Sequence, residues 1–143
     1  MTIERKLHER RRAAEAAPAL GLLTVVLALD SELSAAEALA VLDASNVTSA
    51  PVVDDNQVLV GVVSASQLAL LRDDPEAEVE DAMSTHVVAA TDEASIADVL
   101  QLLARQELDR LPIVTTGGTL RGVVTAMDVV RWFAGEADRQ RSS

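Results

Sequence analysis

Two short strings of residues, 61 positions apart, carry the side chains with the most evident chemistry. They read Gly-Val-Val-Ser-Ala-Ser-Gln over residues 61–67 and Gly-Val-Val-Thr-Ala-Met-Asp over residues 122–128. Thr125 stands where a strand is expected to turn into a helix, and the free N–H groups of a helix N-terminus suit a phosphate. Asp128 follows in the first helical turn, where a carboxylate that only accepts hydrogen bonds suits a vicinal diol. Gly122 would let a ligand approach the backbone closely.

The same residues also have a purely structural interpretation. Thr125 with Asp128, and Ser64 with Gln67, have the spacing of a capping box, in which a hydroxyl and a side-chain oxygen satisfy free N–H groups at a helix start. Both strings fit that role, whereas Gln67 is neutral and longer than an aspartate, so only the second string suits a ribose well. A helix cap alone and a ligand site at the second string both remain open, and the first string is the weaker candidate.

Nearby arginines favour the second string further. Arg110 and Arg131 are spaced to lie near Thr125 and Asp128, whereas the first string has Ser49 and Leu70 at the equivalent positions. An anionic ligand needs such cations, because the chain after residue 15 carries seven Arg and 20 acidic groups. Solvated surface arginines are an equally good interpretation of the same two residues.

The two strings belong to a longer internal repeat, which defines the elements that position them. Residues 31–71 and 92–132 align without a gap, with 12 of 41 positions identical, among them Pro51 with Pro112 and Gly61 with Gly122. A repeat of this length indicates two similar units in one domain of 143 residues, with paired clefts between them.

Each copy is predicted to form strand–helix–strand–strand–helix. We expect a charged helix over 2–17, a strand over 22–29, helices opened by capping boxes at Ser34 and Ser95, and hairpins over 51–63 and 112–124. Closing helices follow near 66–71 and 127–134, and the chain end from Gly135 looks frayed. The acidic connector 73–81 is expected to be solvated rather than a metal site, because no fixed set of ligands accompanies it.

Composition excludes several classes of function. The chain has no cysteine, two histidines and two aromatic residues, so it offers no thiol chemistry, no oriented catalytic triad and no base-stacking platform. The net charge of −11 disfavours nucleic-acid binding, and no apolar run is long enough to span a membrane. We expect a cytoplasmic, non-enzymatic protein.

The ordered set of these features resembles the CBS (cystathionine-β-synthase) domain, and two such domains in tandem form a Bateman module. Residues 82–88, Ala-Met-Ser-Thr-His-Val-Val, are similar to the short segment that commonly precedes a CBS unit. The resemblance implies an α/β (α+β) fold of two β-α-β-β-α units related by a pseudo-two-fold axis, with helices outside the sheets. The expected boundaries are a helix or tail at 1–19, unit one at 20–73, a linker at 74–82, unit two at 83–134 and a tail at 135–143.

The resemblance also implies a regulatory protein that binds AMP, ADP, ATP or S-adenosylmethionine between its units and requires no cofactor. In the family the Ser or Thr contacts phosphate, the Asp binds the ribose hydroxyls, and backbone groups read the adenine. The ligand-binding residues implied here are Gly122, Thr125, Asp128, Arg110, Arg131, Val88, Leu111 and Pro112, and those of the weaker first site are Gly61, Ser64, Gln67 and Pro51.

Two further expectations concern partners. CBS pairs commonly dimerise through their closing helices, so we expect a homodimer and take Trp132 and Phe133 as an exposed apolar pair at that interface. The alternative is a ligand-free adaptor in which the repeats form the dimer and the helix at 2–17 captures an unknown regulated protein. In that case deletion of residues 1–17 would leave the fold intact.

Overall fold

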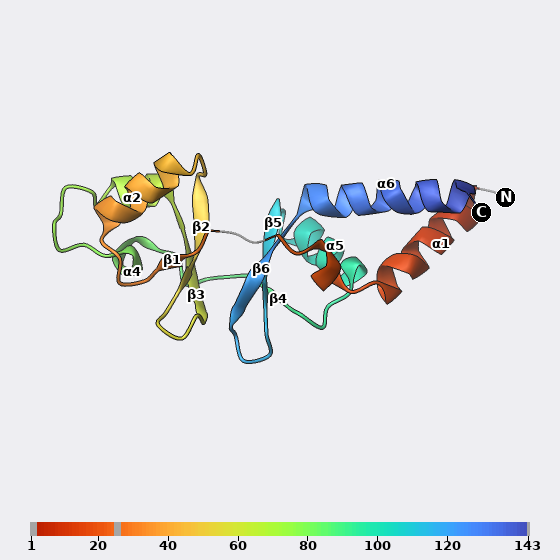
Figure 1. The fold of residues 1–143 in the computed structure, drawn as a ribbon, viewed down its shortest axis with the longest axis horizontal. Helices are drawn as coiled ribbons and strands as arrows, with labels where there is room; N and C mark the ends of the chain where they lie inside the picture. The colour runs from red at the N-terminus through yellow and green to blue at the C-terminus, as the bar shows by residue number, and fades with distance from the viewer. Residues whose placement is uncertain (1–2, 25–26, 143) are drawn as a thin grey trace. The chain divides into compact units, whose positions relative to one another are not determined.

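A computed structural model of the chain describes residues 3–24 and 27–142, with the side chains described for residues 9–24 and 27–135. The described elements follow one another twice in the predicted strand–helix–strand–strand–helix order (Figure 1). In chain order they are α1 (Ile3–Ala16), the 3-10 helix η1 (Ala19–Leu22), β1 (Leu29–Asp30), α2 (Ala35–Ala44), β2 (Ser49–Val53), β3 (Leu59–Ser64), α3 (Ala65–Ala69), α4 (Val79–Ala82), β4 (Ala90–Thr91), α5 (Ile96–Arg105), β5 (Arg110–Val114), β6 (Leu120–Thr125) and α6 (Ala126–Ser142).

The chain folds as two compact units. The first-repeat unit consists of residues 26–88 and 116–120, and the second-repeat unit consists of residues 1–25, 89–115 and 121–143. Each unit holds a three-stranded sheet, in the order β1–β2–β3 or β4–β5–β6. The first strand pairs parallel to the second in each sheet, and β2 pairs antiparallel to β3.

The core of the first-repeat unit lies between its sheet and its helices. Leu29, Val52 and Val63 from the strands pack with Leu42 of α2 and Leu68 of α3, each at most 2% exposed. Helices α2 and α4 lie on the same side of the β2–β3 hairpin (Figure 1). Burying these branched side chains from helix and sheet is the main force that holds such a small unit together.

The second-repeat unit has the same plan and an additional helix. Ile113 of β5 and Val124 of β6 are fully buried, as is Val99 of α5. Helix α1 contacts both α5 and α6, and its Ala14 is 1% exposed. Helix α1 is therefore a packed part of this unit, and the effect of removing residues 1–17 stays a prediction.

Two predicted elements differ from the structure. The strand expected over 22–29 is only Leu29–Asp30 in β1, because the preceding residues form η1 and an isolated bridge between Thr24 and Val123. The tail expected to be frayed after Gly135 is helical, since α6 continues to Ser142. The Trp132 and Phe133 rings meet edge to face at 5.1 Å and are half-buried, so the expected exposed aromatic pair is also wrong.

Each repeat is completed by the segment that leads into the other one. We call residues 17–24 and 77–84 the lead-ins. The first lead-in precedes β1 in the chain but lies in the second-repeat unit, where the Ala17 carbonyl accepts from Ile96 N at 2.9 Å and Ala19 N donates to the Ala94 carbonyl at 2.9 Å. Its end then pairs with β6, with Thr24 N donating to Val123 O at 3.0 Å and Val123 N to Thr24 O at 3.1 Å.

The second lead-in makes equivalent bonds in the first-repeat unit. The Ala77 carbonyl accepts from Ala35 N at 2.9 Å, Val79 N donates to Leu33 O at 2.8 Å, and Ser84 exchanges two backbone bonds of 2.9 and 3.0 Å with Val62. The repeat of the structure thus extends beyond the region of sequence identity, and the two lead-ins are exchanged between the two halves of the chain.

Candidate ligand site at the start of helix α6

The site is built where β6 runs directly into α6. Thr125 N donates to Asp128 Oδ2 at 3.0 Å, and Asp128 N donates to Thr125 Oγ1 at 3.0 Å. These reciprocal bonds form the predicted capping box, which satisfies two of the N–H groups at the helix start. The box also holds both functional side chains in a fixed orientation beside the N-terminus of a 17-residue helix.

The capping box uses only one side of the Asp128 carboxylate. Oδ2 accepts the Thr125 N–H, while Oδ1 lies 3.9 Å from Arg131 Nη1. The Asp128 side chain is 19% exposed. Because a carboxylate offers about four lone-pair positions, Oδ1 retains the capacity to accept further hydrogen bonds, as a vicinal diol would require.

Two arginines lie near this helix start. The carbonyl of Asp109 accepts from Ala126 N at 2.7 Å, so the beginning of β5 lies against the first residue of α6. Arg110 follows directly, with Nε 3.9 Å from Asp109 Oδ1, and its side chain is half exposed. The Arg131 side chain is 75% exposed. Both ion pairs are long and solvated, so neither guanidinium is firmly held by its carboxylate.

The other residues expected at this site lie in different surroundings. Leu111 and Pro112 are buried in β5, so only their backbone groups can contact a ligand. Val88 belongs to the first-repeat unit and lies outside the strands. Gly122 is covered by the first lead-in, because a Cβ added there would lie 2.7 Å from Thr24 O and 2.8 Å from Leu23 Cγ. The group that lies close to Gly122 is therefore the first lead-in and not the ligand that the sequence predicts.

The equivalent position in the first repeat has the cap without the charges. Ser64 N donates to Gln67 Oε1 at 2.8 Å and Gln67 N donates to Ser64 Oγ at 3.2 Å. Gln67 supplies no carboxylate, and α3 has five residues. Gly61 is covered by the second lead-in, with Ser84 O 2.7 Å from an added Cβ, and Pro51 is buried in β2.

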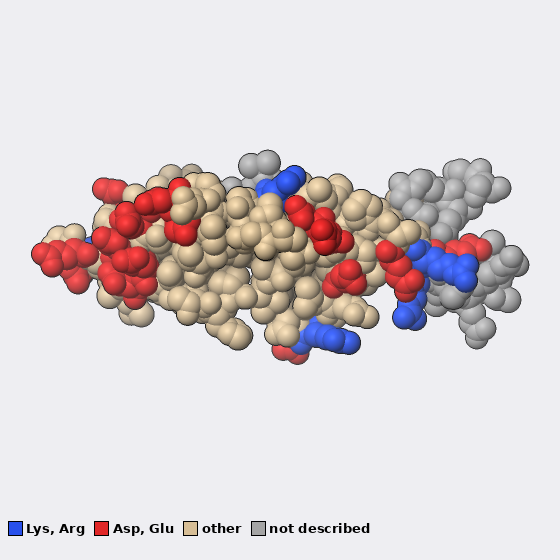
Figure 2. Space-filling view, turned by 90° about the horizontal axis from the view of Figure 1, so that it is seen from below, with Lys and Arg blue, Asp and Glu red and all other residues tan. Residues whose placement is uncertain are grey.

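Acidic side chains gather in the first-repeat unit. That unit holds twelve Asp and Glu residues and one Arg, whereas the second-repeat unit holds eleven acidic and eleven basic residues. Figure 2 shows a group of acidic side chains close together on the surface of the first-repeat unit. Burial, together with the neighbouring Glu80, Glu32 and Asp81, raises the pKa of Glu78.

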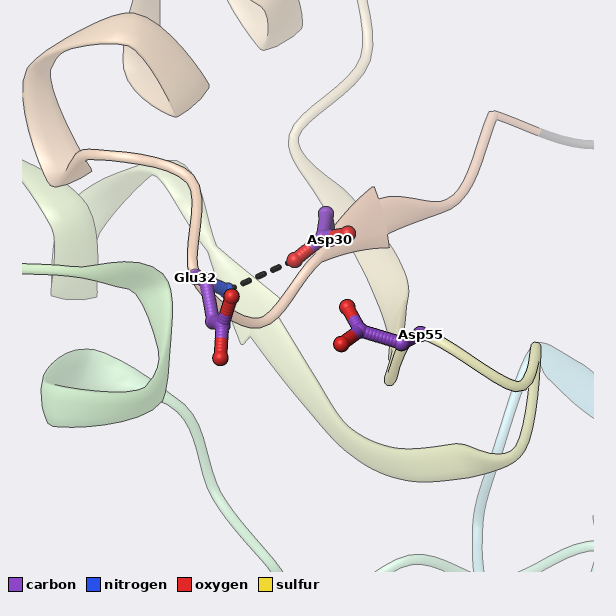
Figure 3. Close-up of side chains that lie close together, drawn as sticks. All are labelled: Asp30, Glu32 and Asp55. Atoms are coloured by element: carbon purple, nitrogen blue, oxygen red, sulfur yellow. Dashed lines mark hydrogen bonds between the residues drawn. The ribbon is translucent and has the colours of Figure 1, made fainter.

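One group of carboxylates comes close enough to hold a cation. The side-chain oxygens of Asp30, Glu32 and Asp55 lie within 4.8 Å of one another, and all three residues are exposed (Figure 3). The one hydrogen bond among them runs from Glu32 N to Asp30 Oδ1 at 2.8 Å, as in an ordinary turn. The group is an acidic surface feature of the first-repeat unit, whereas α6 belongs to the second-repeat unit.

The fold defines a class of protein, the modules built from a tandem pair of β-α-β-β-α units. The CBS domain family matches residues 23–72 and 79–135, and the chain belongs to that family. Among the described residues, no helix has the length and apolar character needed to cross a bilayer.

Known proteins similar to the chain include enzymes and ligand-bound modules. Inosine-5'-monophosphate dehydrogenase of Methanocaldococcus jannaschii is 26% identical over 131 residues, which are 92% of this chain and 26% of the dehydrogenase. The chain thus spans about a quarter of that relative. The structure of CBSX2 in complex with AMP is 28% identical with a TM-score of 0.70, covering 90% of this chain and 100% of that one; CBSX2 comes from Arabidopsis thaliana. The cytosolic domain of the Mg2+ channel MgtE in complex with ATP is 29% identical with a TM-score of 0.71, covering 87% and 52%.

Proposed function

We propose that the chain is a non-enzymatic regulatory module that binds an adenosine nucleotide at the start of α6. The observation that carries this proposal is the Thr125–Asp128 capping box, which leaves Asp128 Oδ1 with only a long, 3.9 Å ion pair to Arg131. The AMP and ATP complexes of CBSX2 and MgtE support the nucleotide class.

The chemistry of each group suggests how the nucleotide is held. The Thr125 hydroxyl and the helix N-terminus bind the phosphate, with Arg110 and Arg131 supplying positive charge. Asp128 Oδ1 accepts from the ribose hydroxyls, and backbone groups of Leu111 and Pro112 read the adenine edge. Because the first-repeat unit has a large excess of acidic groups, its Ser64–Gln67 cap is the weaker place for a phosphate.

Calorimetric titration with AMP, ADP, ATP and S-adenosylmethionine tests the proposal, with thermal unfolding as a second readout. A ligand at 100 times its Kd adds about 2.7 kcal/mol to the free energy of unfolding, which raises Tm by roughly 10 °C for a chain of this size. Asp128→Ala should abolish both the heat of binding and the rise in Tm.

Asp98→Ala is the matched control for this experiment. Asp98 forms the same capping box with Ser95 at the start of α5, with bonds of 3.0 and 3.1 Å. Both variants should lose about 1 kcal/mol of stability, because the N–H of Ser95 or Thr125 loses its side-chain acceptor while the hydroxyl cap remains. Only Asp128→Ala should lose nucleotide binding. If Asp128→Ala binds as tightly as the wild type, or if no ligand binds at millimolar concentration, the site is a helix cap and the proposal fails.

We also propose that the chain forms a homodimer through its closing helices. Met127 and Val130 of α6 are 54% and 58% exposed, and Leu70 at the end of α3 is 85% exposed. Large apolar side chains exposed together on a short helix face are typical of association sites. Any protein regulated by the module would bind this assembly.

A further inference from the structure

The start of α6 is accompanied by a carboxylate, on Asp109, that the fold does not require. The Asp109 carbonyl accepts from Ala126 N at 2.7 Å and so fixes the start of β5 against the first residue of α6. In the first repeat the Thr48 carbonyl accepts from Ala65 N at 2.8 Å in the same way. The contact uses the backbone, so threonine serves it as well as aspartate and the Asp109 side chain is left for another role.

The Asp109 side chain lies in solvent beside the proposed nucleotide site. It is 89% exposed, and its Oδ1 lies 3.9 Å from Nε of Arg110, which is half exposed. A pair of this length between solvated groups is weak. The backbone bond to Ala126 keeps residue 109 next to the N–H groups at which the phosphate is proposed to bind. The carboxylate therefore contributes negative potential at the phosphate position.

The charged side chains around this helix start balance one another. Asp109 is paired with Arg110, and Asp128 with Arg131, each at 3.9 Å. The turn 105–107, before β5, adds one arginine and one glutamate. The net positive potential for a phosphate thus comes from the N-terminus of α6, which is equivalent to about half a unit charge.

We infer that this site takes an adenosine ligand with a single phosphate, and that Asp109 disfavours nucleotides with more phosphates. This inference rests on the proposed function, because it concerns the ligand of the same site. The energy of a ligand beside a fixed charge grows in proportion to the charge on the ligand. One phosphate is compensated by the helix N–H groups, the Thr125 hydroxyl and the arginines. Further phosphates meet a balanced site on a chain whose net charge is −11.

Calorimetric titration of the full chain with AMP and with ATP, at 0.1 M salt and without divalent cations, tests the inference. The wild type should bind AMP about three- to tenfold more tightly than ATP. Asp109→Asn removes the charge, keeps the shape of the side chain and leaves the backbone bond to Ala126 in place. Two unit charges about 7 Å apart in water change a binding constant roughly two- to threefold. The variant should therefore lower the ratio of the ATP Kd to the AMP Kd by about three- to tenfold.

Glu93→Gln is the matched control for this experiment. Glu93 is exposed and belongs to the turn after β4, where Asp92 N donates to Val114 O at 2.8 Å. This turn therefore lies at the end of β5, whereas Asp109 precedes its first residue. A five-residue strand spans about 13 Å, which exceeds the screening length of about 10 Å at 0.1 M salt. The control removes one carboxylate from the same unit and should leave the ratio of the two Kd values unchanged.

The salt dependence of AMP binding is a second readout, which a loss of structure would not reproduce. Asp109→Asn gives the site a net positive charge, so its AMP affinity should fall as salt is added, whereas the wild-type affinity should change less.

The outcomes separate this inference from the proposed function. If the wild type binds ATP as tightly as AMP, or if Asp109→Asn and Glu93→Gln change the ratio equally, Asp109 does not select the ligand and the nucleotide site still stands. If neither nucleotide binds at millimolar concentration, the proposed function fails and this inference fails with it.

Discussion

Gly122→Ala should destabilise the fold because the first lead-in lies directly over this glycine. A Cβ at position 122 would lie 2.7 Å from the carbonyl oxygen of Thr24 and 2.8 and 2.9 Å from Cγ and Cδ1 of Leu23. Carbon–oxygen contacts in proteins lie at about 3.3–3.6 Å. The lead-in must therefore retreat by roughly half an ångström or more, and the backbone bonds that join Thr24 to Val123 must lengthen.

The magnitude follows from packing and from the backbone conformation. Overpacking of a closely packed contact costs about 1–3 kcal/mol, and weakening the two Thr24–Val123 bonds adds to that cost. The φ angle of Gly122 is +158°, which residues with a Cβ rarely adopt, so the substitution adds backbone strain and brings no compensating gain from the unfolded chain. We expect a loss of about 2–3 kcal/mol in the free energy of unfolding.

Equilibrium urea unfolding measures this loss, and the chain supplies two comparisons. Gly61→Ala should behave similarly, because an added Cβ would lie 2.6 Å from Met83 Sδ and 2.7 Å from Ser84 O. Gly21→Ala should be neutral or slightly stabilising, because no atom lies within 4 Å of its added Cβ. If Gly122→Ala unfolds at the same urea concentration as Gly21→Ala, with an unchanged m-value, the lead-in does not lie on this glycine and the described exchange is wrong.

Three further predictions concern stability. Ala14→Leu should lower the free energy of unfolding by about 1–3 kcal/mol, because it overpacks the buried side of α1. Ala16→Leu, at an exposed position of the same helix, should have no effect in urea unfolding. Equal effects of the two substitutions would contradict the packing of α1. The pKa of Glu78 is raised above its ordinary value of 4.5 in the folded protein. The protonated Glu78 side chain therefore contributes to the free energy of unfolding below pH 4.5, and this contribution is lost as the pH rises through the folded-state pKa. Glu78→Gln, which does not ionise, should become more stable relative to the wild type as the pH rises. A stability difference independent of pH would refute this assignment. Separate fragments 1–74 and 75–143 should each lack a cooperative urea transition in far-UV circular dichroism and regain it on mixing, since each repeat is completed by the other's lead-in; a cooperative transition in either fragment alone would contradict this.

Much of the fold could be predicted from local signals. The hairpins and helix starts depend on residues near one another in sequence, such as Ser95 with Asp98, whose capping box is present in full. At Ser34 only half of the predicted capping box is present, because the hydroxyl accepts from Glu37 N but the Glu37 side chain does not bond back to Ser34 N. The backbone of Ser34 also forms a bridge with Glu78 of the second lead-in, an interaction that no local pattern indicates.

The lead-ins could not be predicted because their contacts use the backbone. The two lead-ins share one identical residue, Ala17 with Ala77, and align at an offset of 60 rather than 61, so the comparison that found the repeat could not extend to them. Strand pairing through N–H and C=O groups places little demand on side-chain identity. One feature of the sequence, the glycines Gly61 and Gly122, indicates the lead-ins, since a glycine kept in both copies of a strand indicates that another group approaches the backbone closely. The sequence predicts a ligand as the group that approaches Gly122, whereas in the structure the chain's own lead-in lies there.

The candidate site shows why a duplicated cap need not give a duplicated function. Both closing helices begin with a hydroxyl and a side-chain acceptor in nearly the same hydrogen-bonded arrangement, because any helix start benefits from satisfying its free N–H groups. That structural need is met equally by Gln67 and Asp128. Only Asp128 keeps a charged oxygen for a second partner, and only the second repeat places arginines beside it in a unit without excess negative charge. Function at this site therefore depends on the residues by which the two copies differ, whereas the fold depends on the residues they share.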